Sequence, residues 1–152
     1  MRKKTFIYLV FPLLFMILIS CKNDELILKN IKSGFLYEAG IYTIPSKNRN
    51  ILIKELKDGS LLFAIRNSKS KILFQQSLDE TFSPYHYWML YVDNNANVWY
   101  YNSDYISSKA ILFNEETQQF TVEDFCSVKL QLPLEFKKRI KSHIDQNCQS
   151  LQ

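Results

Sequence analysis

Residues 85–102 read YHYWMLYVDNNANVWYYN, two aromatic runs separated by the short polar stretch from Asp93 to Ala96. Aromatic and β-branched residues favour strands, and Asp and Asn tolerate the left-handed backbone of a tight turn, so this stretch predicts a β-hairpin. Side chains alternate between the two faces of a strand, and both faces of residues 85–92 are apolar or amphipathic. The strand is therefore either a central one covered on both sides or one whose aromatic face is left for a partner.

A helix is the competing interpretation of the same residues. Ser83 suits a helix N-cap and Pro84 suits the first helical position. The aromatic and β-branched content favours the strand, which is our expectation.

Outward from this hairpin, short apolar segments alternate with turn residues, a pattern typical of all-β proteins. Between the runs 50–56 and 61–67, Asp58-Gly59 can supply the positive φ of a tight hairpin turn, and a third turn is expected over 114–118. The predicted strands are 34–37, 41–44, 50–56, 61–66, 71–75, 85–92, 97–101, 110–113 and 120–122. We therefore expect a mainly β fold, a small antiparallel sandwich or meander of hairpins with one C-terminal amphipathic helix.

The helix is predicted over residues 134–147, after Pro133. Phe136, Ile140, Ile144 and Cys148 recur every four residues and would share one helix face. The basic residues of 137–141 are expected to form a solvated face. Residues 31–152 should form a single all-β domain that ends in this helix.

The first 21 residues have the layout of a secretory signal peptide. The cationic start MRKK is followed by an apolar run from Phe6 to Ile19 that only Pro12 interrupts. A helix of this length spans about 21 Å, less than the roughly 30 Å of a bilayer core, so a permanent transmembrane helix is not favoured. The basic start also explains the net charge of +4, because from residue 21 onward 16 basic residues face 15 acidic ones.

The end of the run, Leu18-Ile19-Ser20-Cys21, resembles the lipobox of bacterial lipoproteins, where a small residue precedes an obligatory Cys. The resemblance covers the signal region alone. It implies that the signal peptide 1–20 is cleaved, that Cys21 is lipidated, and that residues 21–30 form a lipidated N-terminus and tether to the bilayer. An ordinary secretory signal with a coincidental Cys is the alternative. Lys22 stands where Asp would retain such a protein at the inner membrane, which favours the outer membrane, facing the periplasm or the cell surface.

The remaining cysteines, Cys126 and Cys148, form an even pair once Cys21 is assigned to lipid. A disulfide between them is permitted outside the cytoplasm. Two buried free thiols and a metal site are the alternatives, although a metal needs more ligands than these cysteines and two distant histidines supply at recognisable spacing.

Catalytic motifs are absent from the sequence. It has no nucleophile elbow, zinc-protease motif or P-loop, and only three Gly. The stretch after Asp93 resembles the start of a calcium loop but lacks Gly at the sixth position and Glu at the twelfth, so a hairpin turn is expected. A carboxylate pair acting as acid and base stays open, because the sequence does not place the acidic residues relative to one another. We assign no catalytic residue, metal or cofactor and expect a non-enzymatic protein.

Charge and aromatic residues are unevenly distributed. Residues 22–71 carry ten basic and five acidic side chains, whereas residues 79–124 carry one and eight and hold eleven of the eighteen aromatics beyond residue 21. An exposed aromatic face beside carboxylates would form a binding surface, because these rings bury a large area at low entropy cost. The candidate surface consists of Trp88, Trp99, Tyr101, Asp93 and Asp104, and the alternative is that these rings are core.

Two ligands suit such a surface, a basic protein steered by the acidic residues and a glycan stacked on the rings. Nucleic acid is not expected, because this stretch repels phosphate. We expect a membrane-anchored, non-enzymatic envelope lipoprotein that binds a protein partner, in its most concrete form an immunity protein against an envelope-targeted toxin. A glycan-binding surface lipoprotein and a structural accessory of an envelope complex are the alternatives.

Overall fold

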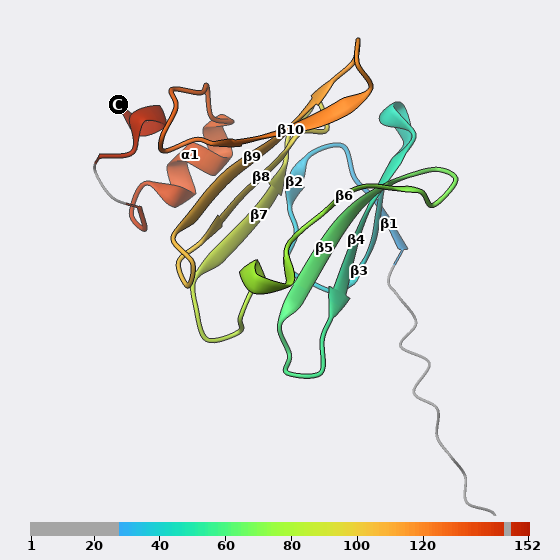
Figure 1. Ribbon diagram of the computed structural model, residues 1–152, viewed down its shortest axis with the longest axis horizontal. Coiled ribbons are helices and arrows are strands. Elements are labelled where there is room, and N and C mark those ends of the chain that lie inside the picture. The colour runs from blue at the N-terminus through green and yellow to red at the C-terminus, as the bar shows by residue number, and fades with distance from the viewer. Residues whose placement is uncertain (1–27, 145–146) are drawn as a thin grey trace, which may run out of the picture.

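The computed structural model describes residues 28–144 and 147–152 as two β-sheets packed face to face, with a helix on the outer side of one sheet (Figure 1). The expected mainly β fold with one C-terminal helix is confirmed. The signal region and Cys21 lie outside the described residues.

The outer sheet, at the right of Figure 1, is a meander with one added parallel strand. In spatial order it contains β1 (Leu28–Asn30), β3 (Gly40–Ile44), β4 (Arg49–Glu55), β5 (Leu61–Asn67) and β6 (Ile72–Gln75). The β4–β5 hairpin turns at Gly59, whose φ of +80° confirms the predicted need for positive φ. Strand β1 was not predicted. It pairs with β3 and takes up the last three residues of the stretch 21–30 that the sequence analysis expects to form a tether.

The central sheet contains β10 (Gln119–Asp124), β9 (Ser107–Asn114), β8 (Val98–Asn102), β7 (Trp88–Val92) and β2 (Gly34–Phe35). All of its pairs are antiparallel. Strand β2 lies between β1 and β3 in the chain but pairs with β7, so the N-terminal part of the chain contributes one strand to the central sheet.

Three short 3-10 helices and one α-helix complete the described secondary structure. They are η1 (Pro45–Lys47), η2 (Leu78–Glu80), α1 (Leu134–Ile140) and η3 (Gln149–Leu151).

The sandwich has two ends that matter below. The lower end in Figure 1 carries the β4–β5 hairpin, the loop 83–87 and the β8–β9 turn 103–106. The upper end carries the β7–β8 turn 93–97 and the β9–β10 turn 115–118.

Each face of the central sheet contributes to a different hydrophobic core. Leu90, Val92 and Tyr100 face the outer sheet and pack with its inner residues, such as Ile51 and Phe63. The opposite face packs against α1 and the C-terminal segment, in a core whose main members are Met89, Tyr91, Trp99, Tyr101, Phe125, Phe136 and Ile140. The part of the 85–92 pattern that forms β7, residues 88–92, therefore belongs to a central strand covered on both sides.

Several predicted boundaries were wrong, and strands β9 and β10, for example, are longer than the predicted 110–113 and 120–122. Strand β7 begins at Trp88 because residues 85–87 lie in a turn, where His86 N–H donates to Ser83 O at 3.3 Å. The helix ends at Ile140, short of the predicted residue 147, and His143 N–H donates to Ile140 O in a tighter turn. Cys148 is buried through its bond to Cys126 rather than by a place on the helix face.

Within residues 28–144 and 147–152, no helix is long and apolar enough to cross a membrane.

Replacing Phe136 by Ala should lower the free energy of unfolding by about 3–5 kcal/mol, because the fully buried ring packs against Tyr91, Trp99 and Phe125. Leu134→Ala, on the same helix but 65% exposed, is the matched control and should change it by less than about 0.5 kcal/mol. Urea denaturation measures both. Equal midpoints for the two variants would contradict the packing of α1 on the central sheet.

Candidate functional site

The structure separates the five residues of the predicted binding surface. Trp99 and Tyr101 are buried, with 4% and 6% of their area exposed, so they cannot present ring faces to a ligand. This corrects their assignment to a surface. The reason is that α1 and the segments before and after it cover this face of the central sheet. His143 O, in the segment after α1, accepts a hydrogen bond from Tyr101 Oη at 2.8 Å.

The other three predicted residues lie at opposite ends of the sandwich. Trp88 is half-buried near the lower end and stacks on Phe82 at a centroid distance of 4.7 Å. Asp104 lies at the same end, 3.3 Å from the imidazole of His86. Asp93 lies in the β7–β8 turn at the upper end. The five residues do not form one site.

The acidic residues of 79–124 are also dispersed, because they lie in η2, in turns at both ends of the sandwich and on β10. Five of the eight have partners within the domain: Glu80 with Tyr100 and Ser107, Asp93 with its own turn, Asp104 with His86, Glu115 with Lys47, and Asp124 with Ser108. The charge asymmetry of the sequence is therefore not an acidic surface.

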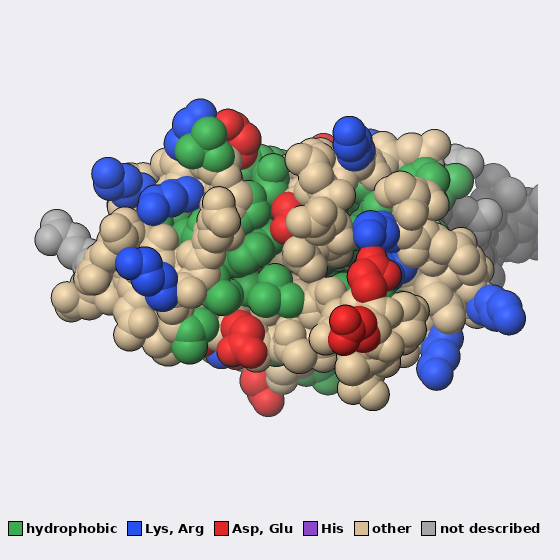
Figure 2. Space-filling view, turned by 90° about the horizontal axis from the view of Figure 1, so that it is seen from above, with side chains coloured by type: hydrophobic (Ala, Val, Ile, Leu, Met, Phe, Trp, Pro, Cys, Tyr) green, Lys and Arg blue, Asp and Glu red, His purple; other side chains and the backbone are tan. Residues whose placement is uncertain are grey.

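A cleft of about 1050 Å³ opens at the upper end, between the β7–β8 turn and the segment that leads into α1. It is lined by Tyr91, Asp93, Asn94, Asn95, Lys129, Leu130, Gln131, Leu132, Pro133, Leu134, Glu135, Lys137, Ser150 and Gln152. Figure 2 views the molecule from this end and shows hydrophobic side chains gathered in the middle of the face. This cleft is the candidate functional site.

One wall of the cleft is a turn built around the Asp93 carboxylate. One carboxylate oxygen accepts the N–H groups of Asn95 and Asn97, and the other accepts Asn97 Nδ2 and Trp99 Nε1, all within 2.8–3.0 Å. The predicted hairpin turn is confirmed, although Ala96 rather than an Asx residue has the positive φ, 62°. Since all four contacts are internal, Asp93 shapes the wall and has little capacity left for a ligand.

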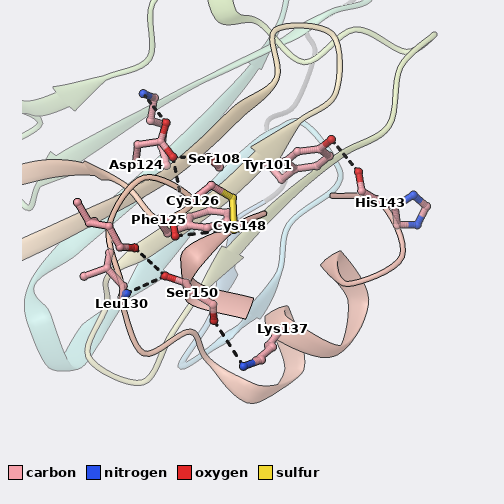
Figure 3. The surroundings of a disulfide bond; sticks show 12 residues. Tyr101, Ser108, Asp124, Phe125, Cys126, Leu130, Lys137, His143, Cys148 and Ser150 are labelled. Carbon is pink, nitrogen blue, oxygen red and sulfur yellow. Dashed lines mark hydrogen bonds and ion pairs between the residues drawn. A yellow bond between two sulfur atoms is a disulfide. The ribbon is translucent and has the colours of Figure 1, made fainter. Parts of the chain in front are cut away.

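The opposite wall is held by the C-terminal residues (Figure 3). Ser150 Oγ accepts the N–H of Leu130 at 2.7 Å and donates to Val128 O at 2.9 Å. Ser150 is positioned in turn by the neighbouring disulfide between Cys126 and Cys148, whose sulfur atoms lie 2.09 Å apart. Of the three alternatives that the sequence left open, the structure shows the paired cysteines. The two walls are thus fixed by separate hydrogen-bond networks.

The lining of the cleft combines apolar and polar side chains. Apolar carbon from Leu130, Leu132 and Tyr91 lies beside side-chain amides of residues such as Asn94 and Gln131. Burial, with the negative charges of Asp93 and Glu135, raises the pKa of Tyr91, so its phenol stays protonated. Apolar contact beside amides that both donate and accept hydrogen bonds suits an extended peptide segment.

No catalytic or metal constellation is found among the described residues of the cleft. No three His, Cys, Asp or Glu side chains in residues 28–144 and 147–152 come together as a metal site. The cleft lining holds neither His nor Cys, and its one serine, Ser150, has its hydroxyl hydrogen-bonded to the Leu130 N–H and to Val128 O. The arrangement is suited to binding.

The segment 129–134, which supplies most of one wall, was not predicted as part of a site. Its letters KLQLPL place Leu at every second position, the period of a strand, but the structure has no strand there, and the letters carry no recognisable functional motif. It belongs to the candidate site only because it lines the same cleft as the distant 93–95 turn, and no local sequence signal encodes that arrangement.

No protein-family description, curated protein or solved structure matches this chain.

Replacing both Cys126 and Cys148 by Ser should lower the free energy of unfolding by about 3 kcal/mol, because the bond closes a loop spanning 22 positions. Urea denaturation with and without a reductant measures the effect. Reductant should shift the wild-type midpoint and leave the double variant unchanged. A wild-type midpoint that does not respond to reductant would contradict the bond's contribution.

The Asp124 carboxyl, which lies beside the disulfide, makes a pH-dependent contribution to the stability of the fold. Burial opposes its ionisation, but hydrogen bonds from Ser108 Oγ and the Cys126 N–H, together with Lys109, hold its pKa below the ordinary value of 3.8. A depressed carboxyl pKa stabilises the fold above the unfolded-state value, and this stabilisation is lost as pH falls through the folded-state value.

Ser108→Ala should therefore be less stable than wild type at neutral pH, and the difference should shrink between about pH 5 and pH 2, where the carboxyl becomes protonated in both proteins. Thermal unfolding across this range measures it. Thr121→Ala, an exposed hydroxyl on β10, is the control and should show no such pH dependence. A stability difference for Ser108→Ala that is constant with pH would contradict the role of Asp124.

Proposed function

We propose that this protein is a lipid-anchored envelope lipoprotein that binds a protein partner in the cleft at its upper end. The single observation that carries the proposal is the preorganised cleft, whose two walls are held by separate networks before any partner arrives. Rigid walls reduce the ordering cost of association.

The lining of the cleft favours a polypeptide. Asn94, Asn95 and Gln131 offer amides that can pair with a backbone, and Leu134 is a large apolar side chain left 65% exposed at the rim. Exposed apolar side chains next to polar groups are characteristic of protein interaction sites. Lys129 and Lys137 balance Asp93 and Glu135, so the cleft itself gives no preference for a basic partner.

The compartment supports a specific kind of partner. The lipobox-like Leu18-Ile19-Ser20-Cys21 favours an anchor outside the cytoplasm, and the cysteine pair is consistent with an oxidising environment. A small anchored domain with a rigid cleft and no catalytic group suits an immunity protein that captures a toxin directed at the envelope. The buried positions of Trp99 and Tyr101 make a glycan platform at these rings the weaker alternative.

A deletion strain should be outcompeted by its siblings in contact-dependent co-culture, and the full-length gene should restore its survival. Leu134→Arg should fail to restore survival, because a charge in the cleft should cost about 2 kcal/mol of binding, or a roughly thirtyfold rise in Kd. Leu78→Arg is the matched control, since Leu78 is 66% exposed and lies outside the cleft, and it should restore survival fully. Competitive survival is the measurement.

A deletion strain that survives as well as its siblings would contradict the immunity role. Equal restoration of survival by the Leu134→Arg and Leu78→Arg variants would contradict the cleft as the binding site. The anchor is tested separately by labelling with radioactive palmitate, which Cys21→Ala should abolish.

A further inference from the structure

Three large side chains at the lower end of the sandwich are exposed to solvent. Tyr85 in the loop 83–87 is 87% exposed, and in the β8–β9 turn Tyr105 is 46% and Ile106 is 81% exposed. We call these three residues the apolar tip. The two loops that carry them are visible at the lower end of Figure 1, below the central sheet.

Ile106 is also strained. Its φ is +51°, in the left-handed region that β-branched residues rarely adopt. Asn or Gly would fit this turn position without strain and would not expose a hydrocarbon side chain to water. Neither its backbone conformation nor its exposure favours Ile, which points to a role outside folding.

The two loops of the apolar tip are fixed to each other. Ser103 N–H donates to Tyr87 O at 2.9 Å, and His86 lies 3.3 Å from the Asp104 carboxylate. The apolar tip is therefore displayed by a paired structure rather than by two independent loops.

The lower end also includes the turn of the outer sheet. Leu61 and Phe82 exchange backbone hydrogen bonds of 2.9 Å, which places the β4–β5 hairpin beside the start of the 83–87 loop. The charges of this hairpin, Lys54, Glu55, Lys57 and Asp58, balance one another. The Asp104 carboxylate lies against His86, and the Glu80 carboxylate accepts hydrogen bonds from Tyr100 and Ser107, so these two acidic groups have partners within the domain.

The proposed anchor limits which end can face the bilayer. Six residues, 22–27, separate Cys21 from Leu28, so the bilayer surface lies within about 25 Å of Leu28. Leu28 pairs with Ile41, near the start of β3, and β1 runs from there away from the lower end. Leu52, opposite Ile41, is only about 10 Å of strand from Glu55 and the lower turn. The lower end therefore reaches the bilayer well within the length of the tether.

We propose that the apolar tip docks the domain on the lipid bilayer, with Tyr85, Tyr105 and Ile106 seated at the headgroup level. This inference rests on the proposed lipid anchor. Tyrosine suits this depth because its ring is apolar and its hydroxyl stays in contact with water. Docking through the lower end points the cleft away from the membrane, where a partner can enter it.

The test uses the lipidated full chain in vesicles of phosphatidylethanolamine and phosphatidylglycerol. Because Cys126 and Cys148 are bonded and the Cys21 sulfur carries lipid, an introduced Cys is the single reactive thiol for a nitroxide label. Labels are placed at Tyr85→Cys and, as a control at the opposite end, at Leu134→Cys. Collisions with oxygen and with a water-soluble nickel chelate report whether each label lies in lipid or in water.

The Tyr85 label should gain oxygen collisions and lose nickel collisions on vesicles, while the Leu134 label should keep its aqueous values. Adding Ile106→Asn should raise the melting temperature, because Asn accepts the left-handed backbone, and should return the Tyr85 label toward water. If the role of Ile106 were purely structural, the substitution would not raise the melting temperature and at the same time withdraw the Tyr85 label from the lipid.

Flotation of the protein with the vesicles separates the two proposals. A protein that does not float overturns the anchor and the docking together. A protein that floats with both labels in water overturns the docking alone, and this includes the outcome in which the apolar tip binds a protein. Immersion of the Leu134 label instead of the Tyr85 label overturns the orientation.

Discussion

The central sheet must be covered on both faces, and the rest of the structure depends on this constraint. Strands β7 and β8 carry large apolar or aromatic side chains on alternate sides, so neither face can be left in water without a large loss of hydrophobic stabilisation. The outer sheet covers one face. The other face is too large for the seven-residue helix α1 alone, and the irregular segments before and after the helix complete the cover through Leu132 and Cys148.

Covering this face also builds the cleft. An irregular segment has no ladder of its own to satisfy its backbone groups, and here the Leu130 N–H and Val128 O are satisfied by Ser150, which lies two residues after the disulfide-bonded Cys148. Where this segment meets the β7–β8 turn, the two surfaces do not close completely, and the cleft remains. The proposed binding site is thus a consequence of the way the second core is sealed.

Several features could be predicted because their cause is local. The Asp58-Gly59 turn follows from the φ that glycine permits, and the strand at 88–92 follows from alternation of side chains. The bond between Cys126 and Cys148 was one of three alternatives that the cysteine count left open, and the structure shows it. The helix end could not be predicted in this way, because the period from Phe136 to Cys148 continues past Ile140 while the chain turns back toward Cys126. The predicted binding surface failed at Trp99 and Tyr101 because exposure depends on which layer covers a sheet.

By itself the sequence determined the β class, the hairpin turns and the apolar character of both faces of the 85–102 hairpin, since these depend on residues close together in the chain. It also carries the lipobox-like segment that supports the proposed anchor. Only the tertiary structure decided which rings are core, that the acidic residues of 79–124 are dispersed, and that residues 93–95 and 129–134 form one cleft. These properties depend on contacts between segments far apart in the chain. Alternation of side chains along a strand indicates that a face is apolar but does not indicate which segment covers that face.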